Sequence, residues 1–172
     1  MSLPPPPQGF RPCDPHTIVR VELLREGPPL ARAPRKRKRG AFAAGLRYER
    51  RAIEYLRSRY PREFAAHPWF RFRTHDAPVR WAQPDGLIVD FFKGRITIIE
   101  IKLKHTTDAW WQTRRLYEPL VRYLFGERQW HYACCEVVRW YDPAIRVPEH
   151  VVFTDDPSKL YASAYGIHIF GG

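Results

Sequence analysis

Two carboxylates and a lysine carry the chemistry that stands out in this chain. Asp85 follows Pro84, and after fourteen further residues the chain continues as Glu100-Ile101-Lys102. Between these charged ends the segment is almost entirely apolar, as in an inner pair of strands covered on both faces. Two neighbouring carboxylates repel each other and lose hydration, so a cation is needed to keep both ionised. The pattern therefore predicts a site for a divalent metal ion.

A tight turn centred on residues 93–94 would bring these charged ends together. In that register Asp85 lies opposite Lys102, and Leu87 lies opposite Glu100. Side chains alternate between the two faces of a strand, so both acids and the lysine share one face. Oxygen ligands suit magnesium or manganese, whereas zinc is not favoured because the group holds neither His nor Cys. We therefore expect Mg²⁺, or Mn²⁺, as the cofactor.

A helix upstream of the hairpin supplies a third acid. From Gly40 the pattern becomes helical, with inward positions three or four residues apart, and it ends before Pro61. The six inward positions are Phe42, Leu46, Glu49, Ile53, Leu56 and Tyr60. Glu49 is the only acid among them, and it is available to the same site.

The other elements indicate an α/β fold with a mixed central sheet flanked by helices. Strands are expected at residues 18–24, 69–74, 79–92, 95–103, 130–138, 151–153 and 166–170. A second helix is expected over residues 107–125 with a kink at Pro119, and a further helical segment over residues 156–164. Helices on both faces of the sheet would cover the apolar hairpin.

Residues 1–39 are expected to form a proline-rich, basic N-terminal arm with at most one short strand. They hold nine Lys or Arg against three Asp or Glu, which is more than half of the chain's net charge of +11. Residues 40–172 then form the single domain. This charge favours a polyanion as partner, with nucleic acid first. The basic run expected to contact phosphates comprises Arg35, Lys36, Arg37, Lys38 and Arg39.

The second helix opens with aromatic and basic pairs. Trp110 or Trp111 could stack on an unpaired base, although core packing is the alternative for at least one of them. Arg114 and Arg115 could line a phosphate track, and a solvated helix face explains them equally well.

The chain lacks the signals of a secreted, membrane or metal-ribbon protein. It has no run of about 18 apolar residues, and its first ten residues contain no apolar signal core. Cys13, Cys134 and Cys135 are too few and wrongly spaced for a zinc ribbon or a four-cysteine iron–sulfur cluster, so we expect reduced thiols. An intracellular, cytoplasmic protein is expected.

The motif as a whole resembles the PD-(D/E)xK nuclease superfamily. It consists of "PD", fourteen residues and "EIK", preceded by a helix with an inward glutamate. The resemblance covers roughly residues 40–140 and implies a restriction-endonuclease-like fold. By this resemblance Asp85 and Glu100 bind the metal together with the backbone carbonyl of Ile101. Glu49 contacts metal or water, and Lys102 orients or helps to deprotonate the attacking water.

The helix after the motif offers a further point of comparison. RecB-type and resolvase-like members often carry a glutamine there, followed four residues later by a tyrosine. Gln112 matches the first position, but Leu116 stands four residues later and Tyr117 five. The match to that subgroup is therefore incomplete, and no cysteine cluster indicates the iron–sulfur subgroup.

The resemblance implies a metal-dependent nuclease that hydrolyses DNA phosphodiester bonds, encoded by a phage or mobile element for recombination, replication or DNA-end processing. Junction resolvase, exonuclease and transposase-associated endonuclease all stay open, as do a homo-oligomer and partner proteins of recombination or replication. The alternative is a non-catalytic DNA-binding or packaging factor that keeps the nuclease fold.

Overall fold

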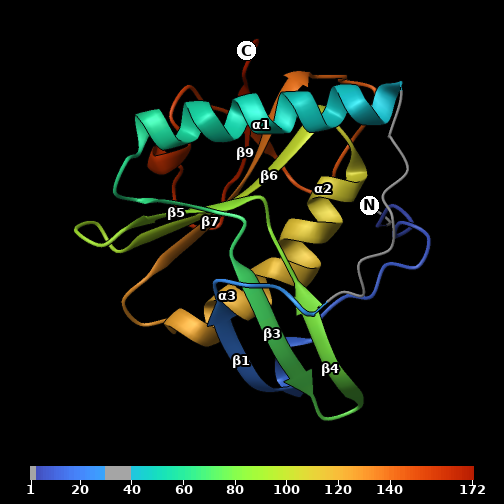
Figure 1. Ribbon diagram of the computed structural model, residues 1–172, viewed down its shortest axis with the longest axis vertical. Helices are drawn as coiled ribbons and strands as arrows, with labels where there is room; N and C mark the ends of the chain where they lie inside the picture. Colours follow the sequence, from blue (N-terminus) through green and yellow to red (C-terminus); the bar gives the residue numbers. More distant parts are fainter. Residues whose placement is uncertain (1–2, 30–39) are drawn as a thin grey trace.

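The computed structural model describes residues 3–29 and 40–172, which form an α/β fold with two β-sheets (Figure 1). The larger sheet has the strand order β2-β5-β6-β7-β9-β8, and its last four strands are parallel to one another. Its strands are β2 (Phe64–Ala66), β5 (Gly86–Asp90), β6 (Arg95–Lys104), β7 (His131–Trp140), β8 (Val151–Phe153) and β9 (Tyr165–Ile169). The smaller, antiparallel sheet has the order β1-β3-β4, from β1 (Ile18–Leu24), β3 (Trp69–Thr74) and β4 (Ala77–Ala82).

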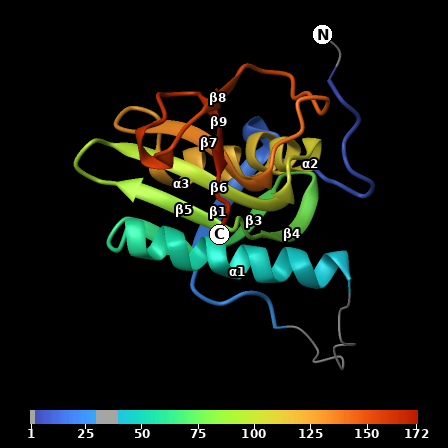
Figure 2. The same cartoon turned by 90° about the horizontal axis from the view of Figure 1, so that it is seen from above.

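Helices cover both faces of the larger sheet, as expected of inner strands that are apolar on both sides. On one face lies α1 (Ala41–Arg59), whose axis is roughly aligned with the antiparallel strands β5 and β6 (Figure 2). The other face is covered by α2 (Thr107–Gln112), the π-helical turn η2 (Thr113–Tyr117) and α3 (Glu118–Phe125). Two short 3₁₀ turns, η1 (Pro15–Thr17) and η3 (Pro157–Lys159), complete the described elements. The expected mixed sheet with flanking helices is thus confirmed at the level of an α/β class.

The first helix forms where it was expected, but its apolar stripe packs along only part of its length. Ile53 and Leu56 are buried against the sheet, as predicted. Phe42 and Leu46 are 52% and 43% exposed, because the first turns of α1 extend past the sheet. Glu49 therefore lies where the helix passes from solvent onto the sheet.

The register of the β5–β6 hairpin differs from the prediction by two residues. The last pair is Asp90 with Arg95, so the loop has four residues rather than two. The backbone N–H of Lys93 donates to Asp90 Oδ1 at 3.0 Å, and Gly94 has a φ of 59°, which together close this longer loop. The predicted pairing of Asp85 with Lys102 is therefore wrong. The shift is even, however, so the predicted shared face is retained.

Two other sequence predictions need correction. The expected strand over residues 79–92 is divided into β4 and β5, which belong to different sheets, and the chain crosses between them at residues 83–85. Pro84 lies at this break and has no N–H to donate to a ladder. The helical segment expected over residues 156–164 is only η3, since Asp156 caps a single turn and the chain then returns to the sheet as β9.

The N-terminal residues that the structure describes pack onto the domain. The predicted strand is confirmed as β1, which pairs with β3. Cys13, Ile18 and Val21 are buried in the same cluster as the strands of the larger sheet. The basic run 35–39 lies outside the described residues. Among the described helices, none is both long enough and apolar enough to cross a lipid bilayer.

Candidate metal site

The site lies where the chain passes between the two sheets. Ala66 pairs with Gly86 in the β2–β5 ladder, so the next residues outward, His67 and Asp85, lie opposite each other. Continuation of the β5–β6 register places Asp85 opposite Glu100. Three polar side chains therefore form one row across neighbouring strands.

Glu100 and Lys102 point to the face covered by α2, η2 and α3. On β6, Ile96 and Ile98 belong to the core cluster on that face, whereas Ile99 and Ile101 pack against α1. Glu100 and Lys102 share the parity of the first pair and hence its direction. The geometry of the sheet therefore brings these two residues and Asp85 to one face, as predicted.

His67 adopts a backbone conformation that is uncommon for a residue other than glycine. Its φ is 49°, and two hydrogen bonds to the crossing loop hold it there. The His67 N–H donates to the Asp85 carbonyl at 3.0 Å, and Gln83 Nε2 donates to the His67 carbonyl at 3.0 Å. Backbone strain that is held in this way is typical of functional sites.

Asp85 is fixed by the backbone of the next strand. The N–H of Ile101 donates to Asp85 Oδ2 at 2.6 Å, because β5 begins only at Gly86 and leaves this donor without a strand partner. Burial raises the pKa of Asp85 to about 6, against the lowering effect of the Ile101 N–H. The charge of Glu49 raises it further. A nearby positive charge would therefore stabilise the ionised form of this carboxylate.

Glu100 is the most deeply buried acid of the row, with 3% of its surface exposed. Its Oε1 pairs with Lys102 Nζ at 2.7 Å, while its Oε2 is buried and has no hydrogen-bond partner. Burial raises its pKa to about 8, with Asp85 as the next cause. Burial alone would lower the pKa of Lys102, but the carboxylates of Glu100 and Asp85 raise it. The lysine is therefore held in its charged form.

Glu49, His67 and Asp85 form a second group of ligand atoms around the same aspartate. One atom from each of the three lies within 4.8 Å of the others, and His67 Nε2 is 3.7 Å from Glu49 Oε1. Two carboxylates and an imidazole suit Mn²⁺ and similar cations as well as Mg²⁺. Glu100 is outside this group, but its unpaired oxygen lies in the same row. The donor set thus fits the expected divalent cation. Asp85 belongs both to the row with Glu100 and to the group with Glu49 and His67.

His67 is the residue that sequence reasoning missed. It had no recognisable spacing to the motif, because its approach to Asp85 depends on β2, a three-residue strand that was not predicted. Its presence also changes the expected ligand set, which contained no histidine. The Ile101 carbonyl is a ligand only by resemblance, since the contact that the structure gives is from its N–H.

The π-helical turn accounts for the unusual spacing between Gln112 and Tyr117. In η2 the N–H of Glu118 donates to the Thr113 carbonyl, five residues earlier. Such bonds bring residues five apart onto one face of the helix, and π turns occur frequently at functional sites. Pro119 follows directly and lacks the N–H that a regular helix would use, which is a physical reason for the turn.

Tyr117 lies on the side of the helix that faces the acids. Tyr117 is 5% exposed and donates to the Gln83 carbonyl at 3.1 Å, in the loop that carries Asp85. Burial raises the pKa of Tyr117, and the charges of Glu100 and Asp85 raise it further. The Oε1 of Gln112 is buried without a partner.

The aromatic and basic residues of the second helix that were predicted to contact nucleic acid are mostly packed within the fold. Arg114 has a side chain that is 11% exposed and is paired with Glu118 and Glu149 at 2.7 Å, so its guanidinium is occupied within the fold. Arg115 is exposed and lies 5.6 Å from the ring of Trp110. Trp110 and Trp111 are 5% and 8% exposed, which favours their packing alternative.

A second buried glutamate lies next to the site. Glu136 on β7 is the direct neighbour of Glu100 in the parallel β6–β7 register and is fully buried. It accepts hydrogen bonds from His105 Nδ1 at 2.6 Å, the Thr106 N–H at 3.1 Å and the Tyr165 hydroxyl at 3.2 Å. Burial alone would lower the pKa of His105, but Glu136 raises it. Both carboxylate oxygens of Glu136 are therefore paired.

Comparison with known proteins adds no identity: no family model matches the chain, and neither curated proteins nor solved structures give a match.

Proposed function

We propose that this chain is a metal-dependent nuclease of the restriction-endonuclease-like type, which hydrolyses phosphodiester bonds in DNA. The observation that carries the proposal is Glu100, whose buried and unpaired carboxylate oxygen lies in one row with Asp85 and beside Lys102. A buried carboxylate oxygen without a partner costs free energy that a bound cation would recover. The order of α1, the β5–β6 hairpin, α2 and β7 supports the finer assignment of the fold.

Each side chain has a role that its position supports. Asp85, Glu49 and His67 offer ligand atoms, and Glu100 offers its free oxygen. When bound, a divalent cation would lower the pKa of a water molecule and neutralise charge on the phosphoryl oxygens. Lys102 is held charged by Glu100 and Asp85, so it orients the water and stabilises negative charge rather than acting as the base.

The imidazole of His67 adds a prediction about the metal. Carboxylate oxygens alone suit Mg²⁺, whereas an imidazole nitrogen favours a transition metal such as Mn²⁺. We expect faster cleavage with Mn²⁺ than with Mg²⁺, and a smaller difference between the two metals in His67→Ala.

Cleavage assays on linear, circular, single-stranded and branched DNA with Mg²⁺, Mn²⁺ or EDTA test the proposal. Asp85→Asn and Lys102→Met should abolish cleavage. The matched controls are Asp90→Asn, at the far end of the same β5 strand, and Lys104→Met, an exposed lysine two residues further along β6. Cleavage that survives Asp85→Asn, or that proceeds in EDTA, would contradict the proposal. The form of DNA that is cut would separate a resolvase from an exonuclease.

A further inference from the structure

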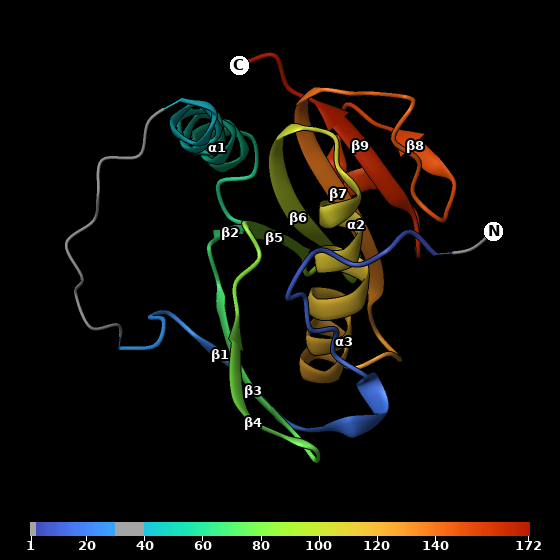
Figure 3. The ribbon, with the colours of Figure 1, turned by 90° about the vertical axis from the view of Figure 1, so that its right-hand side faces the viewer.

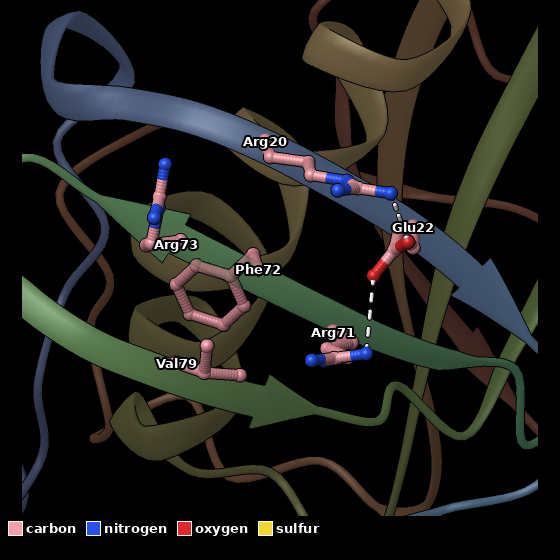
Figure 4. A pocket seen from close by; sticks show the side chains of 6 residues that line it. All are labelled: Arg20, Glu22, Arg71, Phe72, Arg73 and Val79. Atoms are coloured by element: carbon pink, nitrogen blue, oxygen red, sulfur yellow. Dashed lines mark hydrogen bonds and ion pairs between the residues drawn. The ribbon is translucent and has the colours of Figure 1, made fainter.

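The outer face of the three-stranded sheet carries an array of arginines. On β3, Phe70, Phe72 and Thr74 are buried, and the alternate residues Arg71 and Arg73 are exposed. Their cross-strand neighbours on β1 are Glu22 and Arg20, respectively. Three arginines and one glutamate thus share this face, and together with Phe72 and Val79 they line a concavity of about 200 Å³ (Figure 4).

The charges on this face are not balanced within the fold. Arg20 and Arg71 both turn toward Glu22, at 2.7 and 3.6 Å (Figure 4). Among the described residues Arg73 has no ion pair or hydrogen bond, although it lies directly opposite Arg20 across the ladder. Like charges in directly opposite positions destabilise a sheet. The arrangement therefore has an energetic cost that an anion on this face would relieve.

Aromatic side chains lie at the end of this face that is nearer the metal site. Trp69 begins β3, two residues after His67, and its ring is 6.1 Å from that of Trp81. Trp81 is the β4 partner of Arg71, so the two indoles and the arginines share one face. Both indoles are partly exposed and could contact sugars or bases.

The face extends away from the candidate metal site in a defined direction. In Figure 3, α1 lies above and the three-stranded sheet lies below the region where β2 and β5 begin. A strand advances about 3.4 Å per residue, so Arg71 and Arg73 lie roughly 7 and 14 Å along β3 from Trp69, which begins the strand two residues after His67. One strand of a DNA duplex advances about 3.4 Å per nucleotide. The spacing of about 7 Å between the two arginines would match phosphates two nucleotides apart on one strand of the duplex.

We propose that the outer face of β1-β3-β4 is a docking surface for the phosphate backbone of duplex DNA beside the metal site. This inference rests on the proposed function for its choice of DNA, but its test does not require cleavage. Arg71 and Arg73 supply the contacts, Arg20 and Glu22 hold the local geometry, and the tryptophans separate the arginines from the metal site.

The test is binding of a fluorescent 30-base-pair duplex in EDTA across a range of salt concentrations. The double variant Arg71→Gln/Arg73→Gln leaves the Arg20–Glu22 pair intact. We expect it to bind about tenfold more weakly near 0.15 M salt, with a salt-dependence slope smaller by about 2, because each lost phosphate contact removes nearly one released counterion. The matched control Arg57→Gln/Arg128→Gln removes the same charge from exposed positions on α1 and before β7.

The outcomes separate this inference from the proposed function. Equal weakening by both double variants would overturn the docking surface, because net charge alone would then explain binding. Absence of duplex binding by the wild type would overturn it as well. A double variant that loses binding to phosphatidylserine vesicles but keeps DNA binding would assign the face to a membrane and overturn the inference. Selective loss of DNA binding in a protein that never cuts DNA would support the surface and contradict the nuclease.

Discussion

Glu100 and Glu136 are neighbours on adjacent parallel strands, and both are buried, but their surroundings differ. Glu136 accepts three hydrogen bonds, from His105, Thr106 and Tyr165. Glu100 has one partner, Lys102, and its second oxygen has none. The hydrogen bonding of the buried carboxylate is thus satisfied at Glu136 and left unsatisfied at Glu100.

The difference indicates which of the two acids belongs to structure and which to function. A buried carboxylate that is fully paired holds its neighbours in place, and here it fixes the turn from β6 into α2 through Thr106. A buried carboxylate with a free oxygen has a desolvation cost that the folded chain alone does not offset. We therefore propose that Glu136 positions its neighbours and that Glu100 binds a cation.

The largest expected effect is on cleavage. Glu100→Gln should lower the cleavage rate at least about 100- to 1000-fold, the range found when one charge-stabilising group is removed from an active site. It should not lower the free energy of unfolding by more than about 1 kcal/mol, since the amide avoids repulsion by Asp85. Rates on the best substrate and urea denaturation measure the two quantities. A strongly destabilised but active variant would reverse the assignment.

Glu136→Gln should show the opposite pattern. Removal of this charge leaves His105 buried and short of a partner, which should cost about 3 kcal/mol of unfolding free energy. The fraction that remains folded should still cleave DNA at a rate within about tenfold of the wild type. His105→Gln in the Glu136→Gln background should recover part of the stability. A stable, inactive Glu136→Gln protein would place this residue in the catalytic machinery.

The pH dependence of stability sharpens the same contrast. The pKa values of Asp85 and Glu100 are raised to about 6 and about 8, so the folded metal-free protein binds protons more tightly than the unfolded chain. Its stability should therefore decrease as pH rises from about 5 to about 8, by roughly 5 kcal/mol, since one pKa unit corresponds to about 1.4 kcal/mol.

Thermal unfolding in EDTA across this pH range measures the effect. The double variant Asp85→Asn/Glu100→Gln should show a smaller change of stability with pH. In the wild type, Mn²⁺ in place of EDTA should restore the stability at pH 8. A wild-type protein that becomes more stable over the same range in EDTA would contradict the pKa directions on which this prediction rests.

A smaller effect is expected at the π-helical turn. Tyr117→Phe removes the hydrogen bond to the Gln83 carbonyl and should cost about 1 kcal/mol. Because Gln83 belongs to the loop that carries Asp85, cleavage should also fall severalfold. The control Tyr123→Phe removes an exposed hydroxyl that donates to Val19, far from this loop in the sequence. Equal losses of cleavage in the two variants would remove any special role of Tyr117.

Much of the site was predictable because strands alternate strictly. The convergence of Asp85, Glu100 and Lys102 on one face depends only on residue parity, so it survived a two-residue error in the register. The position of α1 followed from its periodic apolar residues, and buried thiols at Cys134 and Cys135 agree with their place in a strand.

The rest depended on contacts that no local pattern specifies. His67 reaches the site through β2, whose three residues are too few for a recognisable alternation. Arg114 resembled a surface residue in the sequence, but Glu149, 35 positions later, pairs with it. The break before β5 and the π turn occur at Pro84 and Pro119, and hydrophobic periodicity alone detects neither.

Calorimetric titration of Mn²⁺ into the metal-free protein at pH 7, in two buffers of different ionisation enthalpy, tests the central claim most directly. Because Glu100 has a pKa of about 8, the cation should displace close to one proton on binding. The Glu100→Gln variant should bind Mn²⁺ at least about tenfold more weakly and should release fewer protons than the wild type. Absence of Mn²⁺ binding by the wild type, or equal affinity and proton release in the variant, would contradict the account.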